Sequence, residues 1–305
     1  MRPASWYFTW HARHTLVASA ATLTLMATIA LLPPLTLAQQ LLVLAAFVCV
    51  TALPHGAVDH LAGRTVFGRW GRAWPAVFGG VYLALLALTV AVWLAAPPLA
   101  LTLFLLLSAL HFGYGDLRPE RGGFVEAALR GSIPVFGPIL FWPAATAQLF
   151  GWLLPGTEPA SVLAVTRTIA SATPFALLAW AGLALYQYRF ARKDGFEIIA
   201  LVLLVLALPP LLSFGIYFCG WHSFRHGLEC AAELDRRGPR RGWLAYARHA
   251  APLTLATIGL GAAAYLLLSD ARLDPVAMTR VVFIGLAALT VPHVVIHALC
   301  ARRLA

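Results

Sequence analysis

The sequence predicts an all-α integral membrane protein, a polytopic helical bundle of about ten transmembrane helices, with eight or nine as alternatives. Of its 305 residues, 61% are hydrophobic and only 11% are charged, whereas about a quarter of the residues in a soluble domain are charged. Apolar segments long enough to cross about 30 Å of hydrocarbon recur along the whole chain. Their apolar residues are continuous and do not alternate with polar ones, which favours helices over a β-barrel.

The first apolar segment is predicted to be a transmembrane helix that stays in the protein. Arg2 and Arg13 precede it, and residues 36–38 (TLA) resemble a signal-peptide cleavage site. The apolar run over residues 15–32 is longer than the apolar core of a signal peptide, which has about 7 to 15 residues. We therefore expect this segment to form the first span.

Polar, Pro and Gly residues divide the rest of the chain into further spans. In chain order, the ten expected spans cover residues 14–32, 40–57, 76–96, 99–116, 131–154, 169–188, 196–211, 213–234, 249–268 and 277–299. The break at Pro209 and Pro210 either ends one span before the next returns or kinks a single long helix. No linker or internal repeat interrupts the pattern, which indicates one membrane domain.

The distribution of basic residues favours the turn at Pro209. With ten spans and both termini in the cytoplasm, all but three of the 22 Lys and Arg residues lie in cytoplasmic segments. Without that turn, the basic loop at residues 236–241 would lie on the opposite side, against the positive-inside rule. The sequence thus predicts a multi-pass protein of the cell (inner) membrane with cytoplasmic termini.

The net charge of +10 is explained by this topology and does not indicate a nucleic-acid partner. The basic residues lie in short links between apolar runs, where they face an anionic leaflet. The four cysteines have no CxxC spacing, so we expect buried packing residues and neither a disulfide framework nor a zinc site.

Seven of the ten histidines lie within the expected spans or at their ends. They form four motifs: His55 and His60 in PHGAVDH, His111 in HFGYGD, His222 and His226 in HSFRHGLE, and His293 and His297 in PHVVIH. The spans that carry them all run from outside to inside, and each motif lies in the cytoplasmic half of its span. We therefore expect the imidazoles at one shared depth, while His11, His14 and His249 are expected at solvated interfaces.

A shared metal site is the best explanation for four such motifs. An imidazole inside hydrocarbon is costly unless it is paired, so intramembrane histidines are functional candidates. A single histidine could simply bond to a neighbouring helix, but this is a poor explanation for four motifs together. Neutral imidazoles suit iron, copper and zinc, and the pairs at positions 222/226 and 293/297 each project from one helix face.

Carboxylates and aromatic residues accompany these histidines. Asp59, Asp116 and Glu229 each follow a motif histidine by three to five residues, and such acids often accept the second ring N–H of a ligand histidine. Ion pairs with arginines at the cytoplasmic rim are the alternative. Aromatic side chains such as Tyr114 either pack at the interface or line a tunnel for a conjugated hydrocarbon.

In these motifs, from PHGAVDH to VPHVVIHAL, the chain resembles the Brp/Blh family of bacterial and archaeal β-carotene 15,15'-dioxygenases. The resemblance implies one membrane-embedded domain over residues 1–305 that uses iron and O2 to split β-carotene at its central double bond into two molecules of all-trans-retinal. It implies β-carotene and O2 as substrates, the lipid bilayer as surroundings, and a microbial rhodopsin as the receiver of retinal.

The family's motifs also imply which residues hold the metal. The residues that match its Fe(II) ligands are His55, His111, His222 and His226. The resemblance gives no role to His60, His293 and His297. Together with Asp59, Glu229 and Tyr114, these three are candidates for groups that support the ligands or face the substrate.

Three other functions remain as alternatives. A membrane di-iron hydroxylase or desaturase, acting on a carotenoid or lipid, would need HxxHH boxes, and this chain has none. A haem-binding electron-transfer protein would use histidines from paired helices as axial ligands. A proton-coupled transporter would need titratable groups spread along a path through the bilayer, whereas these motifs lie at one expected depth.

Overall fold

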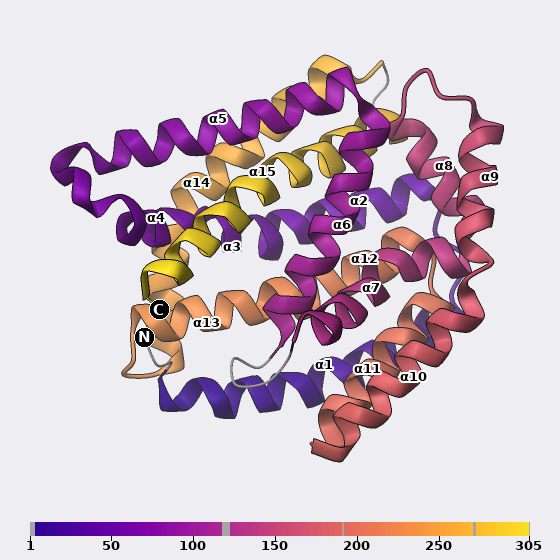
Figure 1. Ribbon diagram of the computed structural model, residues 1–305, viewed down its shortest axis with the longest axis horizontal. Coiled ribbons are helices and arrows are strands. Elements are labelled where there is room, and N and C mark those ends of the chain that lie inside the picture. The colour runs from indigo at the N-terminus through magenta and orange to yellow at the C-terminus, as the bar shows by residue number, and fades with distance from the viewer. Residues whose placement is uncertain (1–3, 118–122, 191, 271–272, 305) are drawn as a thin grey trace.

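The computed structural model describes residues 4–117, 123–190, 192–270 and 273–304. Within these ranges the chain is almost entirely helical and has no β-strand, which confirms the all-α prediction. In Figure 1, α1 begins and α15 ends at the same end of the molecule, on the left. The two ends of the chain therefore lie on one side of the helical bundle.

The helices follow one another with short connections. They are α1 (Ser5–Leu31), α2 (Leu37–Phe47), α3 (Leu53–Ala57), α4 (Asp59–Phe67), α5 (Trp74–Ala95), α6 (Pro97–Asp116), α7 (Phe124–Phe141), α8 (Pro143–Leu153), α9 (Pro159–Ala170), α10 (Thr173–Phe190), α11 (Arg192–Ala207), α12 (Pro210–Tyr217), α13 (Phe224–Leu234), α14 (Pro239–Leu268) and α15 (Pro275–Leu304). Two π-helical turns, η1 (Val48–Ala52) and η3 (Phe218–Ser223), and one 3₁₀ turn, η2 (Gly68–Ala73), lie between them.

Six helical segments of the described chain are long and apolar enough to cross a membrane, and α9 with α10, bent by 46°, would make a seventh. One of the six is the run Leu37–Ala95, in which the chain turns at Gly71, a glycine with φ 55°. Beyond this turn, α5 runs back in the opposite direction to α2 and α4 (Figure 1). The predicted multi-span membrane protein is confirmed, but the predicted count of ten spans is not.

Several features explain the difference in count. The spans expected over residues 40–57 and 76–96 fall within the single segment Leu37–Ala95, and the one over residues 169–188 lies in the bent pair. Helix α11 has only 16 residues. The span expected over residues 131–154 is broken at Pro143, which begins α8, but α7 before it does count as a spanning segment. The segment predicted over residues 213–234 is divided into α12, η3 and α13. Proline lacks the backbone N–H that continues a helix, and a helix of 11 residues is too short to cross about 30 Å of hydrocarbon.

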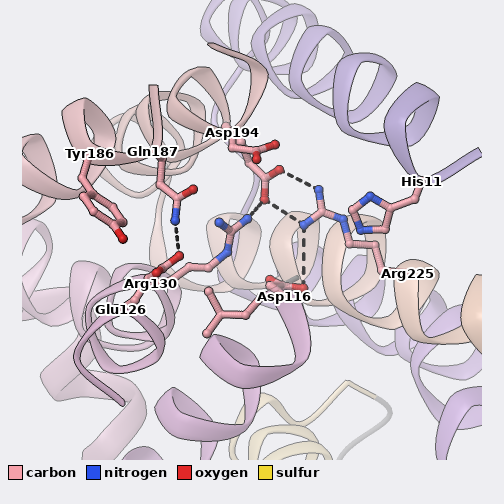
Figure 2. Close-up of a pocket in the computed structure, with 10 residues that line it drawn as sticks. His11, Asp116, Glu126, Arg130, Tyr186, Gln187, Asp194 and Arg225 are labelled. Carbon is pink, nitrogen blue, oxygen red and sulfur yellow. Dashed lines mark hydrogen bonds and ion pairs between the residues drawn. The ribbon is translucent and has the colours of Figure 1, made fainter. Parts of the chain in front are cut away.

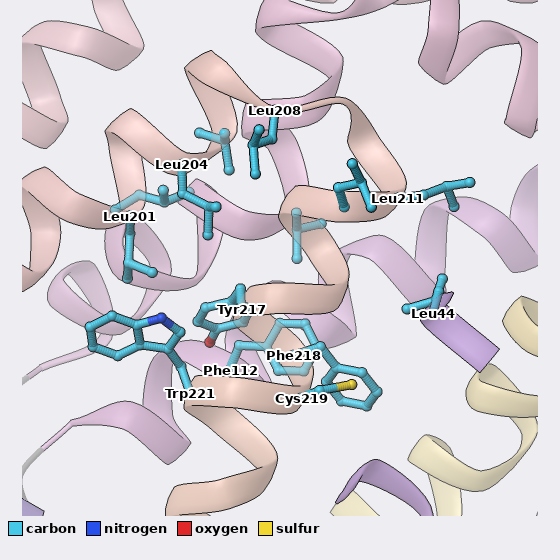
Figure 3. Packing of buried hydrophobic residues seen from close by; sticks show 14 of the residues in the cluster. Leu44, Phe112, Leu201, Leu204, Leu208, Leu211, Tyr217, Phe218, Cys219 and Trp221 are labelled. Carbon is cyan, nitrogen blue, oxygen red and sulfur yellow. The ribbon is translucent and has the colours of Figure 1, made fainter. Parts of the chain in front are cut away.

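The centre of the bundle is apolar and tightly packed. Figure 3 shows the middle of this core, where leucines of α11 and α12 lie above the aromatic rings of Phe112, Tyr217, Phe218 and Trp221. Tyr217 and Trp221 are each 1% exposed. Many leucines point outwards instead, and Leu267 for example is 86% exposed, as expected for a surface in contact with lipid chains.

Two glycines let α6 and α7 approach each other closely. A Cβ atom on Gly131 would collide with the carbonyl oxygen of Ala109, and one on Gly113 would collide with that of Ala127. Small residues at helix contacts allow such backbone approach in membrane proteins. The contact fixes the part of α6 that carries His111.

The two π-helical turns occur beside two of the histidine motifs. The turn η1 ends just before α3, which carries His55, and η3 contains His222 itself. Single π turns are rare and are frequent at functional sites. They change the direction in which the following side chains point, which the sequence pattern had not predicted.

The close contact between α6 and α7 gives a first prediction. The Gly131→Ala variant should unfold at a lower temperature in detergent than the wild type, because overpacking at a helix contact costs about 1–3 kcal/mol. Gly80→Ala on α5 is the matched control, because no atom lies within 4 Å of its new Cβ. Equal melting temperatures for Gly131→Ala and the wild type would contradict the described contact.

Candidate metal centre

Six histidines from four parts of the chain meet inside the bundle. They are His55 on α3, His111 on α6, His222 on η3, His226 on α13, and His293 and His297 on α15. In Figure 1 the run from α2 to α4, the run from α12 to α13, and α15 all point towards the end of the molecule where the chain begins and ends. The motifs that we expected at one depth therefore converge in space.

The first group consists of His55, His111 and His222, whose nearest possible ligand atoms all lie within 4.8 Å of one another. The Nε2 atoms of His111 and His222 face each other at 3.1 Å. The Nδ1 atom of His55 is buried and has no hydrogen-bond partner. The His111 and His222 nitrogens are therefore directed at each other, and the ring of His55 lies 5.9 Å from that of His222.

The second group consists of His226, His293 and His297, which meet the same 4.8 Å limit. The two groups adjoin each other, because the ring of His55 lies 5.4 Å from that of His226 and 5.3 Å from that of His293. Of the four residues expected as ligands, the structure thus places three in one group and His226 in the neighbouring group.

Asp59 lies behind the second group. Its Oδ1 atom is 2.7 Å from Nδ1 of His293 and 3.2 Å from Nε2 of His297, and the Tyr82 hydroxyl donates to Oδ2 at 3.1 Å. This carboxyl is only 2% exposed. Asp59 therefore supports the histidines of α15, although in the sequence it follows His55.

Asp116 lies behind the first group. Its Oδ1 atom is 3.7 Å from Nδ1 of His222, and the buried Tyr217 hydroxyl donates to its Oδ2 at 2.7 Å. Arg225 lies on the other side, with Nη1 3.8 Å from Asp116 Oδ1. Asp116 therefore lies close to both His222 and Arg225, but its Oδ1 atom accepts a hydrogen bond from neither of them.

A buried ion-pair network extends from Asp116 (Figure 2). Arg225 donates to both oxygens of Glu197 at 2.7 Å, in the two-pronged geometry typical of strong arginine–carboxylate pairs. Arg130 also pairs with Glu197. Sequence reasoning missed Glu197 and Arg130, since the only signal for them was a charge at the end of an expected apolar span.

The remaining candidates lie away from the two groups. His60 bonds to the carbonyl oxygen of Ala57 at 3.1 Å, and its ring is 5.9 Å from that of His249. Tyr114 is 51% exposed, and Glu229 is half-buried on α13. The expected solvated position of His14 is wrong, because this half-buried ring bonds to the carbonyl oxygen of Gly220 and stacks on Phe224.

An apolar cavity of about 70 Å³ lies between α6, α7, α8, α12 and α15, and no histidine lines it. Its walls include Leu105, Phe150 and Phe283, together with Phe214. Phe214 stacks on Phe218, and the ring of Phe218 is in turn parallel to that of His222. Aromatic rings therefore connect the cavity to the first group of histidines.

Comparison with known proteins agrees with the histidine motifs. The profile of the family described as "Beta-carotene 15,15'-dioxygenase" matches residues 46–300, a range that includes all six clustered histidines. The chain belongs to the β-carotene 15,15'-dioxygenase family. No solved structure matches the chain.

Two members of this family are similar over most of their length. "Probable beta-carotene 15,15'-dioxygenase Blh" of Halobacterium salinarum is 32% identical over 286 residues, which cover 83% of this chain and 82% of the relative. "Beta-carotene 15,15'-dioxygenase" of an uncultured marine bacterium 66A03 is 29% identical over 263 residues, which cover 82% of this chain and 90% of the relative. "Probable beta-carotene 15,15'-dioxygenase Brp" of Halobacterium salinarum is 24% identical.

The clustered side chains of this β-carotene 15,15'-dioxygenase family member fit a metal ion. Histidine nitrogens at about 2.1 Å from one ion lie roughly 3 Å apart when they are neighbours at right angles, and the Nε2 atoms of His111 and His222 are 3.1 Å apart. Buried imidazoles backed by carboxylates are the usual way in which proteins orient metal ligands. The arrangement is therefore suited to a metal ion that prefers imidazole ligands, such as iron, copper or zinc.

The ion-pair network behind the histidines gives a second prediction. Glu197→Gln should destabilise the protein by about 3–5 kcal/mol, because it leaves two buried arginine charges without their shared partner. Thermal unfolding in detergent measures this loss. The matched control is Asp235→Asn, which removes a carboxylate from an exposed ion pair. Asp235 pairs with the Arg237 side chain, which is 75% exposed. Hydrogen bonds from the Arg237 backbone N–H and side chain lower the pKa of the Asp235 carboxyl group. An equal loss in both variants would contradict the prediction.

Proposed function

We propose that this protein cleaves β-carotene with O2 at the central 15,15' double bond. The convergence of four histidine motifs in a membrane-embedded member of this family is the observation that carries the proposal. The reaction breaks one carbon–carbon double bond and places one oxygen atom on each carbon. One molecule of β-carotene and one of O2 thus give two molecules of retinal, without a further reductant.

We propose that His55, His111, His222 and His226 hold the Fe(II) ion. Neutral imidazole nitrogens are suitable ligands for iron, and Asp116 lies behind His222 at 3.7 Å, within the range of an electrostatic contact but longer than a hydrogen bond. The bound ion would supply the activation of O2. The side chains themselves keep the ion in place and keep it inside a site from which water is excluded.

The apolar cavity would mark where one arm of the carotenoid enters the bundle, and its walls would have to move apart, because about 70 Å³ is well below the roughly 300–1,000 Å³ of a ligand pocket. Its aliphatic and aromatic walls match a hydrocarbon chain, and the stacked rings of Phe214 and Phe218 lead from it towards His222. A site inside the bilayer also lets an insoluble substrate enter directly from the lipid. The retinal produced could leave by the same route and pass to a microbial rhodopsin.

We further propose that both termini face the cytoplasm and that residues 1–305 form a single domain in the cell membrane. The described ends of the chain lie at one end of the bundle (Figure 1), and the distribution of lysines and arginines favours the cytoplasm for that end. The site would then lie in the cytoplasmic half of the membrane.

A third prediction concerns the ligands. His222→Ala should abolish retinal formation in a β-carotene-producing bacterium, because its ring faces both His111 and His55. The wild type should bleach the orange cells while retinal appears in the extract. His249→Ala, which replaces an exposed histidine, is the matched control. A fully active His222→Ala protein with normal membrane insertion would refute the ligand assignment.

Product analysis in the same experiment separates the alternatives. Cleavage gives C20 aldehydes, whereas a di-iron hydroxylase would leave the C40 skeleton intact. A strong Soret band in the purified protein would instead indicate haem.

A fourth prediction concerns the apolar cavity. Leu105→Trp should reduce retinal formation several-fold with unchanged iron content, because the larger side chain fills the cavity. The neighbouring residue Leu106 is 51% exposed on the outside of the same helix, so Leu106→Trp is the matched control. Equal activity of the two variants would show that the cavity does not hold the substrate.

A further inference from the structure

We propose that His293 is an additional ligand of the iron centre and that Asp59 holds its ring in the orientation required. This inference rests on the proposed iron site and extends it. Sequence motifs left the role of His293 open, whereas the structure places its ring among the expected ligands.

The ring of His293 lies next to three of the four expected ligands. Its centroid is 5.1 Å from that of His111, 5.3 Å from that of His55 and 5.4 Å from that of His226. Imidazoles bound to one ion at about 2.1 Å have ring centroids roughly 4.5–5.5 Å apart when their bonds make angles of 90–110°. All three distances lie in this range.

His293 also completes a ring of imidazoles. His222 lies 4.8 Å from His111 and 5.9 Å from His55, measured between ring centroids, and His293 adjoins these same two residues from α15. The four rings of His55, His222, His111 and His293 therefore form a closed circuit, and His226 adjoins it through His55 and His293.

Asp59 determines which nitrogen of His293 is available. Its Oδ1 atom is 2.7 Å from Nδ1 of His293, so the ring N–H is on Nδ1 and donates to the carboxylate. Nε2 then carries the free lone pair. A histidine that bonds to a metal through one nitrogen usually donates the other N–H to a carboxylate in this way, so Asp59 acts as a positioning residue.

His297, one helical turn further along α15, differs from His293 in the nitrogen that bonds to Asp59 and in the exposure of its side chain. Its Nε2 atom is the one that bonds to Asp59, at 3.2 Å, and its side chain is 37% exposed while that of His293 is 5% exposed. We therefore expect His297 to support Asp59 from the outside and not to bind the ion.

A histidine at this position changes the number of open sites on the metal. Four imidazoles leave two open positions on a six-coordinate ion, whereas five leave one. A hydrocarbon substrate has no atom that binds iron, so a single open position would be sufficient for a reaction with O2.

The experiment compares the metal-binding properties of four variants with those of the wild type in detergent. We expect one iron per wild-type chain. His293→Gln should weaken Fe(II) binding at least as much as the ten- to hundredfold loss that is typical for removing a carboxylate behind a ligand. It should also change the absorption spectrum of the Co(II)-substituted protein, which depends on the number of ligands.

Asp59→Asn should produce a smaller loss of the same kind, and Asp59→Glu should restore part of the affinity. His297→Ala is the matched control on the same helix and should retain the wild-type Co(II) spectrum and one iron per chain. Thermal unfolding of each variant shows whether the fold is intact, and the spectrum of Co(II) added in excess reports on ligation even if affinity falls.

Two results would overturn the inference. One is a His293→Gln protein with unchanged iron affinity and an unchanged Co(II) spectrum. The other is two metal ions per wild-type chain, of which one is lost equally in His293→Gln and His297→Ala, because His226, His293 and His297 would then form a separate site. Either result leaves the proposed cleavage of β-carotene intact as long as the wild type forms retinal and His222→Ala does not, but the second would remove His226 from the proposed ligand set.

Discussion

Charged groups buried in an apolar bundle must be paired, and this constraint governs the arrangement of the whole histidine site. The Asp116 carboxylate is held between Tyr217 and Arg225, and Glu197 joins Arg225 to Arg130. These residues belong to α6, α7, α11, α12 and α13, so one network of charges connects the helices that surround His222. An uncompensated charge there would cost several kcal/mol. The network therefore fixes the positions of the helices and, through them, the positions of the imidazoles.

Backbone geometry allows the helices to meet this constraint. Gly113 and Gly131 let α6 lie against α7 with almost no side chain between them, which brings Asp116 towards Arg130. On the opposite side, Asp59 binds two histidines of α15 and the hydroxyl of Tyr82 on α5. Two carboxylates thus lie on opposite sides of the site, Asp59 against the histidines of α15 and Asp116 against His222 of η3. Neither carboxylate bonds to the histidine that comes before it in its own motif.

The sequence was sufficient to predict the helical membrane class and the convergence of the histidine motifs, because both depend on periodicity and on charge asymmetry along the chain. It could not predict that His293 adjoins His55 and His111, since this contact depends on the packing of α15. The number of spans also differed, because α11 has only 16 residues and the turn η3 divides a segment that is continuous in the hydropathy pattern. The roles of Glu197 and Arg130 could not be predicted either, because their ion pair joins residues that are far apart in the sequence.

The π-helical turn η3 makes the site sensitive to chain length as well as to residue identity. A π turn contains one residue more than an α turn, and each residue of an α-helix advances the chain by about 100° around the axis. The extra residue forms a local bulge, so deleting one residue from Phe218–Ser223 would let this segment return to regular α geometry and change the directions of the side chains within it, including that of His222. Family members with a functional centre should consequently keep the length of this segment as well as its histidine.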